Sequence, residues 1–351
     1  MVAFLSVAPR VALAAGVLPS ALQPFIAGDV LYTYDRGLQG GGWPYVDLPF
    51  EYPPLIGYLA GFLAHLAPDR TAYVAAWGVV AMAVAAAVGV LVARERHAWR
   101  WALAPQLLLH AGTNFDLLAV APFTAAIVLA RRGRLFAAAA SLGLGGAVKL
   151  FPLVAVAPFV REAPRRAVAL GALAFAVFAS FYLPTIAAQY SPLLGLRFYA
   201  VRIPANEASV WGLVSAAARA AGAVDPVPAL VAITGIGLVV TFVLGVLPRA
   251  RQGDPAIAMG SAVVALLLWS RLYSPQYSLW VAPLFALLPL PRGAFVMLGL
   301  GDVLVAASLY PMLLSGSGTE VWLLGVLGAG VILRQFALLR LWRDLGRRPP
   351  P

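Results

Sequence analysis

The chain contains 351 residues, of which 62% are hydrophobic and only 11% are charged. Soluble domains average about 45–50% apolar and about 25% charged residues, so this composition excludes a soluble protein and indicates an integral membrane protein. The net charge of +11 does not indicate a nucleic-acid partner, because the basic residues form short clusters between apolar stretches. The absence of cysteine excludes disulfides and thiolate metal sites. We expect a single integral domain, residues 1–351, without a cofactor or a metal.

The N-terminal part of the chain predicts one span followed by a polar outer loop. The first 27 residues carry an apolar run without a clear cleavage site, which favours an uncleaved span over a signal peptide. The next segment, GDVLYTYDRGLQGGGWPYVDLPFEYPP (28–54), has four acids and five tyrosines or tryptophans, but no apolar run long enough to enter a bilayer. Residues 53–67 are apolar but short, so we expect them to lie at the outer surface or to re-enter the membrane.

Five arginine-rich clusters predict the topology. They lie at 94–100, 131–134, 161–166, 248–251 and 341–348, and short loops of this kind stay in the cytoplasm. Both termini are then inside, and the chain crosses the membrane about 12 times. The predicted spans lie near 8–27, 71–93, 99–111, 115–130, 135–147, 150–160, 165–187, 226–248, 254–270, 276–291, 293–314 and 320–342.

Residues 135–160 are too few for two full crossings of about 20 residues each, although both flanks are predicted to be cytoplasmic. We therefore predict two short, broken helices that meet near Lys149. Lys149 is the only lysine of the chain, and an unpaired cation at this depth costs about 2.5–3.5 kcal/mol. It is expected to have an anionic partner. One alternative is that Lys149 pairs with a nearby acid or extends to the interface. The other is that Lys149 binds a phosphate.

Two further motifs place polar side chains at helix ends. In RLYSPQYSLW (271–280), Pro275 is expected to start a helix, and Arg271 and Gln276 suit a phosphate. The tyrosine, tryptophan and arginine side chains of this motif, Trp280 among them, also suit ordinary anchors at a bilayer boundary. In TNFD (113–116), Asp116 either caps a helix or orients a site.

The remaining polar positions leave alternatives open. The segment 188–209 is either a substrate-binding lid or an exposed loop, and it carries Arg202 and Asn206. Asp302 lies inside an apolar span, where it is either a proton-relay group or the partner of an arginine in the bundle.

The order of four motifs resembles a known superfamily. An acid-bearing first loop that ends in EYPP is followed by NFD, AVKLFP and SPQYSLW, and this order is similar to that of the GT-C glycosyltransferases. More narrowly, it resembles the bacterial polyprenyl-phosphate-mannose-dependent α-1,2-mannosyltransferases, and more distantly the glycosylphosphatidylinositol mannosyltransferases. The resemblance covers residues 28 to about 285. It implies an all-α polytopic GT-C-like bundle with a catalytic first outer loop.

The same resemblance implies roles for particular residues. The outer loops 28–70 and 188–225 would form the roof of the site. Asp29, followed by Asp35, matches the acid that serves as catalytic base. The paired Asp-x-Asp of the distant relatives is absent, which puts metal dependence in doubt. The donor phosphate would be bound by Lys149, Arg271, Arg202, Gln276 and Tyr277, and the substrates by Tyr45, Glu51, Tyr52, Asn114, Asp116 and Asn206.

The implied activity is the transfer of a sugar, with mannose or arabinose expected, from a polyprenyl-phosphate donor to a glycan or glycolipid acceptor. The enzyme would lie among the lipids of the plasma membrane with its site facing outward. Two other functions are compatible with the sequence. One is a transporter or lipid flippase that uses Asp302 and Asp116 as coupling groups, and the other is a non-catalytic scaffold.

Overall fold

The protein is helical throughout the part that its computed structural model describes, which is residues 1–19, 28–193, 205–222, 226–314 and 321–347. Within these ranges the only extended pairing is an isolated bridge between Pro44 and Leu48. The first half contains α1 (Val2–Ala14), α3 (Asp29–Asp35), η2 (Leu38–Gly40), α4 (Pro54–Leu66), α5 (Arg70–Val92), α6 (Trp99–Ala102), α7 (Pro105–His110), α8 (Asp116–Arg131), α9 (Leu135–Val148) and η3 (Phe151–Arg161). The second half contains α10 (Pro164–Tyr182), η4 (Leu183–Thr185), α12 (Val210–Ala220), α13 (Val227–Thr241), η5 (Phe242–Val246), α14 (Leu247–Gln252), α15 (Pro255–Trp269), η6 (Pro275–Trp280), α16 (Ala282–Leu287), α17 (Arg292–Leu314) and α18 (Val321–Gly346).

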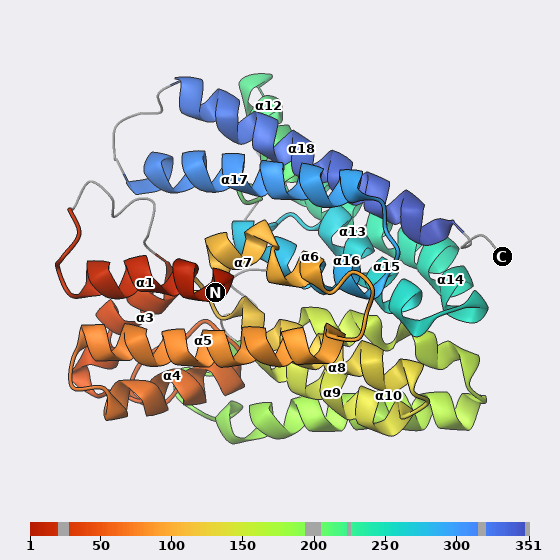
Figure 1. Cartoon of the computed structure of the whole chain (residues 1–351), viewed down its shortest axis with the longest axis horizontal. Helices are drawn as coiled ribbons and strands as arrows, with labels where there is room; N and C mark the ends of the chain where they lie inside the picture. Colours follow the sequence, from red (N-terminus) through yellow and green to blue (C-terminus); the bar gives the residue numbers. More distant parts are fainter. Residues whose placement is uncertain (20–27, 194–204, 223–225, 315–320, 348–351) are drawn as a thin grey trace.

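Many of these helices run roughly along the long axis of the molecule, with α17 and α18 side by side along one edge (Figure 1). Among the residues that the structure describes, five helical segments are long and apolar enough to cross a membrane: Arg70–Val92, Pro164–Thr185, Val227–Arg251, Arg292–Leu313 and Trp322–Gly346. The predicted all-α polytopic architecture is confirmed. The number of about 12 crossings stays a prediction, because several of the expected spans are short or broken helices.

The break at Lys149 confirms the prediction for residues 135–160. Helix α9 ends at Val148, and Lys149 follows in an extended conformation, with φ −157° and ψ 140°. The chain then continues as the 3₁₀ helix η3, with Pro152 in its first turn. Pro152 has no amide to donate to the carbonyl of Val148, four residues earlier, and its ring would clash with that carbonyl, so α9 cannot continue through this point. Because of this break, the Lys149 side chain extends into the interior of the bundle and does not lie on the face of a continuous helix.

The five arginine clusters lie at one end of the molecule, as the topology prediction requires. An arginine of α8 contacts the loops that follow α5 and α14. An arginine of η3 contacts the loop after α14, and an arginine of α14 contacts the end of α18. The long helices α5 and α18 both end on the same side, near the C-terminus (Figure 1). Which side of the membrane this end faces stays a prediction. The contacts are Arg131 with Glu95 and Asp254, Arg161 with the carbonyl of Gly253, and Arg249 with the carbonyl of Trp342.

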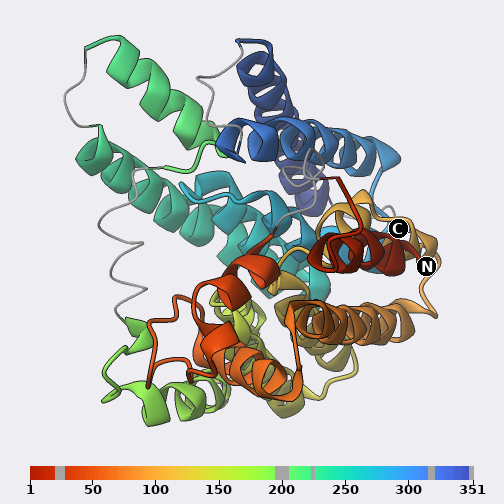
Figure 2. The same ribbon diagram turned by 90° about the vertical axis from the view of Figure 1, so that its left-hand side faces the viewer.

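The segment predicted to be the first outer loop folds into a cap at the other end, where α3 and α4 lie beside the start of α5 (Figures 1 and 2). Tyr45 fixes this loop in a strained conformation: its φ is +70°, a value that costs a non-glycine residue about 1–3 kcal/mol. Its side chain is fully buried and donates a hydrogen bond to the carbonyl of Tyr52 at 2.7 Å, which holds the strained backbone in place. The carbonyl of Tyr45 in turn accepts a hydrogen bond from the amide of Tyr190 at 3.1 Å, so the cap is joined to the segment after α10.

Candidate active site

Asp29 is the first residue of α3, and its carboxylate is held by two side chains from distant parts of the sequence. The hydroxyl of Tyr52 donates to Oδ2 of Asp29 at 2.5 Å, and the side-chain amide of Asn114 donates to the same oxygen. Tyr52 comes from the EYPP motif and Asn114 from the TNFD motif. Two of the predicted motifs therefore meet at the predicted catalytic acid.

A close backbone approach sets the position of Asp29. A Cβ atom built on Gly28 would lie 2.5 Å from both Cγ2 and the carbonyl oxygen of Thr113, so only glycine fits there. On the other side of Asp29, the amide of Val30 donates to the carbonyl of Thr113 at 3.4 Å. The start of α3 is thus in close contact with Thr113, the residue before Asn114.

Lys149 has the anionic partner that was expected for it. Its ammonium lies 2.9 Å from Oδ2 of Asp116, and the two side chains are 17% and 0% exposed. The other oxygen of Asp116 accepts a hydrogen bond from the indole of Trp280 at 2.6 Å. Asp116 is the first residue of α8, but its hydrogen bonds in the described structure go to these side chains instead of capping the helix. The orienting role expected as one alternative is therefore the one that the contacts support.

An aromatic stack supports the lysine from the η6 side. The Lys149 ammonium lies 4.7 Å from the ring centroid of Tyr277, a cation–π distance. The Tyr277 ring stacks on Trp280 with centroids 4.0 Å apart, and Trp280 stacks on Phe151 at 4.2 Å. Trp280 was expected only as a helix anchor. Its indole N–H, a group that seeks an acceptor when buried, was the available signal for its contact with an acid.

The two acids and the lysine form one electrostatic unit. Asn114, which binds Asp29, lies two residues before Asp116, which binds Lys149. Burial raises the pKa of the Asp29 carboxyl to about 6, and this effect outweighs the hydrogen bond from Tyr52 and the charge of Lys149, which both lower it. A carboxylate with this pKa is ionised at neutral pH and is still basic enough to accept a proton.

Three other predicted residues lie apart from this unit or support it indirectly. Asp35, at the opposite end of α3, forms an exposed ion pair with Arg70 at 2.7 Å, and these contacts do not support its expected catalytic role. Tyr45 is fully buried, so its contacts support positioning of Tyr52 in place of the expected substrate binding. Asn206 accepts a hydrogen bond from the amide of Ala208 through its side chain at 2.7 Å, which shapes the turn before α12.

The residues expected to bind the donor phosphate differ in their surroundings. Tyr277 lies against Lys149, whereas Gln276 is a buried residue of η6 with 8% of its surface exposed. The carbonyl of Arg271 accepts hydrogen bonds from the amide of Asn206 at 2.8 Å and from the hydroxyl of Ser209 at 3.0 Å. The backbone of Arg271 thus anchors the segment before α12. Arg202 lies outside the described residues, as does part of the predicted roof loop 188–225.

Asp302 is the partner of a bundle arginine, which was one of its two expected roles. Its carboxylate lies 3.2 Å from Nε of Arg334, and both side chains are essentially buried. It also accepts hydrogen bonds from Ser278 at 2.6 Å and Gln106 at 2.7 Å. Because Ser278 belongs to η6, this buried network fixes the helix that presents Tyr277 and Trp280. Arg334 was missed in the sequence, although it interrupts the apolar run VILRQFALL.

Comparison with known proteins assigns the family. The sequence model of glycosyltransferase family 87 matches residues 50–275, which is more than half of the chain. The chain belongs to glycosyltransferase family 87. This membership confirms the predicted resemblance to membrane glycosyltransferases. The matched range includes Tyr52, Asn114, Asp116 and Lys149, whereas Asp29 lies before it.

One solved structure with a similar architecture is that of ArnT from Cupriavidus metallidurans in the apo state. The likeness has a TM-score of 0.45 and a sequence identity of 16%, and it covers 97% of this chain and 78% of that chain. Among curated proteins, no sequence match to this family 87 chain is found. Within the described residues, no group of three or more histidine or acidic side chains is arranged to hold a metal ion.

The Gly28 contact gives a first testable prediction for this family 87 enzyme. Gly28→Ala should lower the rate of sugar transfer at least about tenfold, because its Cβ would push Asp29 away from Thr113 and Asn114. Gly40→Ala is the matched control, since nothing lies within 4 Å of a Cβ at that exposed position of the same loop. Initial rates of both variants would be measured in the same membranes. Equal rates for the two variants would contradict the positioning role of Gly28.

Proposed function

We propose that the enzyme transfers a sugar from a polyprenyl-phosphate-linked donor to an acceptor hydroxyl at the outer face of the plasma membrane. The single observation that carries this proposal is the placement of Asp29, a carboxylate that can accept a proton, in electrostatic contact with the buried Lys149–Asp116 pair. Family membership supports glycosyl transfer, and the depth of Lys149 favours a phosphate carried by a lipid.

The proposed reaction is a single displacement. The acceptor oxygen attacks the anomeric carbon of the donor sugar, and its proton passes to the Asp29 carboxylate. The bond between that carbon and the phosphate oxygen breaks, and the electron pair leaves with the polyprenyl phosphate. A positioned base of this kind contributes about 10²–10⁴-fold to the rate. Attack opposite the leaving group inverts the configuration at the anomeric carbon.

Lys149 is the proposed contact of the departing phosphate. An ammonium has three N–H donors, and one of them is used by Asp116. The side chain is 17% exposed, and we propose that the remaining donors face the departing phosphate. In surroundings of low dielectric, a fixed cation stabilises developing negative charge more strongly than it would in water. Arg271 and Arg202 are proposed as further contacts of this phosphate.

The alternative functions have little support. Asp302, the main argument for a coupled transporter, is held by Arg334, Ser278 and Gln106 in a network whose four members are all buried. Membership of a glycosyltransferase family also disfavours transport. The scaffold reading is disfavoured by the intact contact between Tyr52, Asn114 and Asp29.

A donor panel tests the proposal. Purified enzyme in nanodiscs would be incubated with radiolabelled polyprenyl-phosphate-linked mannose, arabinose and glucose, and with octyl glycosides or membrane glycolipids as acceptors. Nucleotide-linked forms of the same sugars are the control donors. We expect transfer from at least one lipid-linked donor, with mannose or arabinose favoured. Transfer from nucleotide sugars alone would overturn the proposal.

The pKa of Asp29 gives a second testable prediction. Below about pH 6 the carboxyl is protonated and cannot accept the acceptor's proton, so kcat/KM should fall about tenfold per pH unit in this range. The Tyr52 hydrogen bond lowers the pKa of Asp29. Tyr52→Phe should therefore move the acidic limb of the profile to higher pH. A limb that moves to lower pH, or that stays in place, would contradict the assignment of Asp29 as the base.

A further inference from the structure

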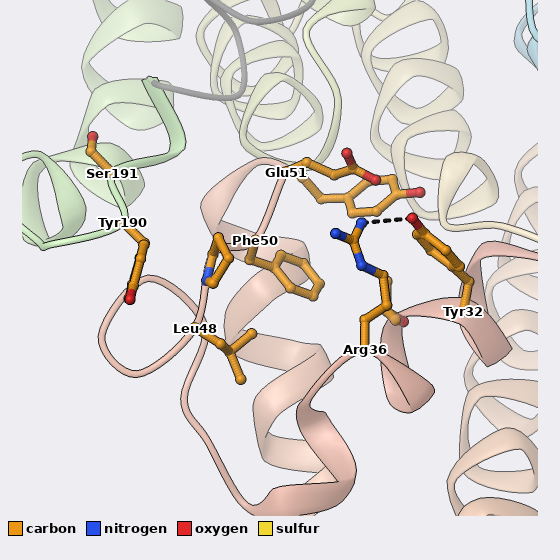
Figure 3. Close-up of a pocket in the computed structure, with 10 residues that line it drawn as sticks. Tyr32, Arg36, Leu48, Phe50, Glu51, Tyr190 and Ser191 are labelled. Atoms are coloured by element: carbon orange, nitrogen blue, oxygen red, sulfur yellow. Dashed lines mark hydrogen bonds between the residues drawn. The ribbon is translucent and has the colours of Figure 1, made fainter.

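A cavity of about 400 Å³ lies between the first outer loop and the segment after α10, and its lining includes Tyr52, the hydrogen-bond partner of Asp29. Small-molecule sites usually have volumes of about 300–1,000 Å³. Its walls include Tyr32 and Arg36 from α3, Phe50, Glu51 and Tyr52 from the loop, and Tyr190 from the opposite side (Figure 3).

The walls of this cavity are fixed in relation to one another. Tyr52 is held by its hydroxyl on Asp29 and by its carbonyl on Tyr45. The amide of Tyr190 donates to the carbonyl of Tyr45 at 3.1 Å, so both sides of the cavity are joined to the same residue. The backbone and aromatic walls of the cavity are therefore built into the cap.

Aromatic rings and a balanced pair of charges line the cavity. The guanidinium of Arg36 donates to the hydroxyl of Tyr32 at 2.6 Å, and the side chains of Arg36, Tyr32 and Glu51 point toward one another (Figure 3). One cation and one anion leave no net charge for a phosphate. A sugar ring offers apolar C–H faces to aromatic rings and hydroxyl groups at its edge, which can accept from Arg36 and donate to Glu51. The lining thus favours a neutral carbohydrate.

The position of the cavity assigns its part in the reaction. Tyr52, whose hydroxyl donates to the proposed base, lines the cavity, whereas Asp29, Asp116, Lys149 and Tyr277 do not. A sugar in the cavity thus lies next to the hydrogen-bond partner of Asp29 and apart from the proposed phosphate-binding lysine. We propose that this cavity binds the terminal sugar of the acceptor, a neutral glycan or glycolipid headgroup, and so determines acceptor specificity; this inference rests on the function proposed above.

Two arms of one experiment test this inference. In the kinetic arm, KM is measured separately for the lipid-linked donor and for octyl α-mannoside as acceptor, in Tyr190→Ala and Glu51→Gln. Loss of an aromatic contact or a hydrogen bond should raise the acceptor KM about 2- to 12-fold and leave the donor KM unchanged. Phe62→Ala is the control, because Phe62 is 52% exposed on α4 and does not line the cavity.

In the labelling arm, a diazirine derivative of octyl α-mannoside is photoactivated on the wild-type enzyme without donor, and the labelled peptides are identified. We expect labels on residues 32–52 and 190–191, reduced in Tyr190→Ala. A raised donor KM, or unchanged KM values for both substrates, overturns the inference, as does labelling elsewhere. If the wild type transfers from no lipid-linked donor, the proposed function fails, and the labelling arm still decides whether the cavity binds a sugar.

Discussion

Asp29→Asn should lower the rate of sugar transfer by about 10²–10⁴-fold and leave the donor KM nearly unchanged. Asparagine has almost the same shape as aspartate, and its carbonyl oxygen can still accept from Tyr52 and Asn114. The substitution removes the ability to take up the acceptor's proton. Initial rates at saturating donor, in membranes with matched protein amounts, would measure this loss.

A second acid in the same loop is the control for Asp29. Asp47 accepts a hydrogen bond from the amide of Trp43 at 2.8 Å in an exposed turn, and asparagine can form the same bond. Asp47→Asn should therefore retain most of the wild-type rate. If Asp29→Asn retained a comparable rate, the carboxylate would not be the base, whatever its surroundings.

Lys149→Ala should abolish transfer and also destabilise the protein. The lost phosphate contact corresponds to about 10²–10³-fold in rate, the usual cost of removing one group that stabilises charge in the transition state. In addition, Asp116 would remain as a buried carboxylate without its cation, and breaking a buried pair in this way costs about 3–5 kcal/mol. The variant is expected to show both a lower thermal unfolding temperature in detergent and a loss of activity.

A double variant separates the two effects of Lys149. In Lys149→Met with Asp116→Asn, no buried charge is left unpaired, and the asparagine oxygen can still accept from the indole of Trp280. We expect the unfolding temperature to recover toward the wild-type value while transfer stays absent. Recovery of transfer together with stability would show that Lys149 has only a structural role.

The sequence predicted those features that depend on local chemistry. The short distance between two arginine clusters required a broken helix, and α9 ends at Val148 because Pro152 has no amide to donate to the carbonyl of that residue. The insertion cost of a lone lysine required an acid, and Asp116 is that acid. Likewise, clusters of arginine resist translocation wherever they occur, so their gathering at one end could be expected without knowledge of the packing.

The pairing of distant side chains could not be predicted in the same way. Tyr52, Asn114 and Asp29 are brought together by the approach of Gly28 to Thr113, and no local pattern specifies that contact. Asp35 resembled a second catalytic acid in the sequence because it shares the loop with Asp29. It lies six residues along a helix, about 9 Å away along the axis, where Arg70 neutralises it.

The proposed reaction requires a donor phosphate at Lys149 with its sugar directed toward Asp29. A structure of the enzyme with a non-transferable phosphonate analogue of a polyprenyl-phosphate-linked sugar tests this arrangement most directly. We predict a phosphonate oxygen within hydrogen-bonding distance of Nζ of Lys149, beside the ring of Tyr277, and the anomeric carbon on the side of Asp29. A phosphonate bound at another place, with Lys149 in contact only with Asp116, would contradict the account.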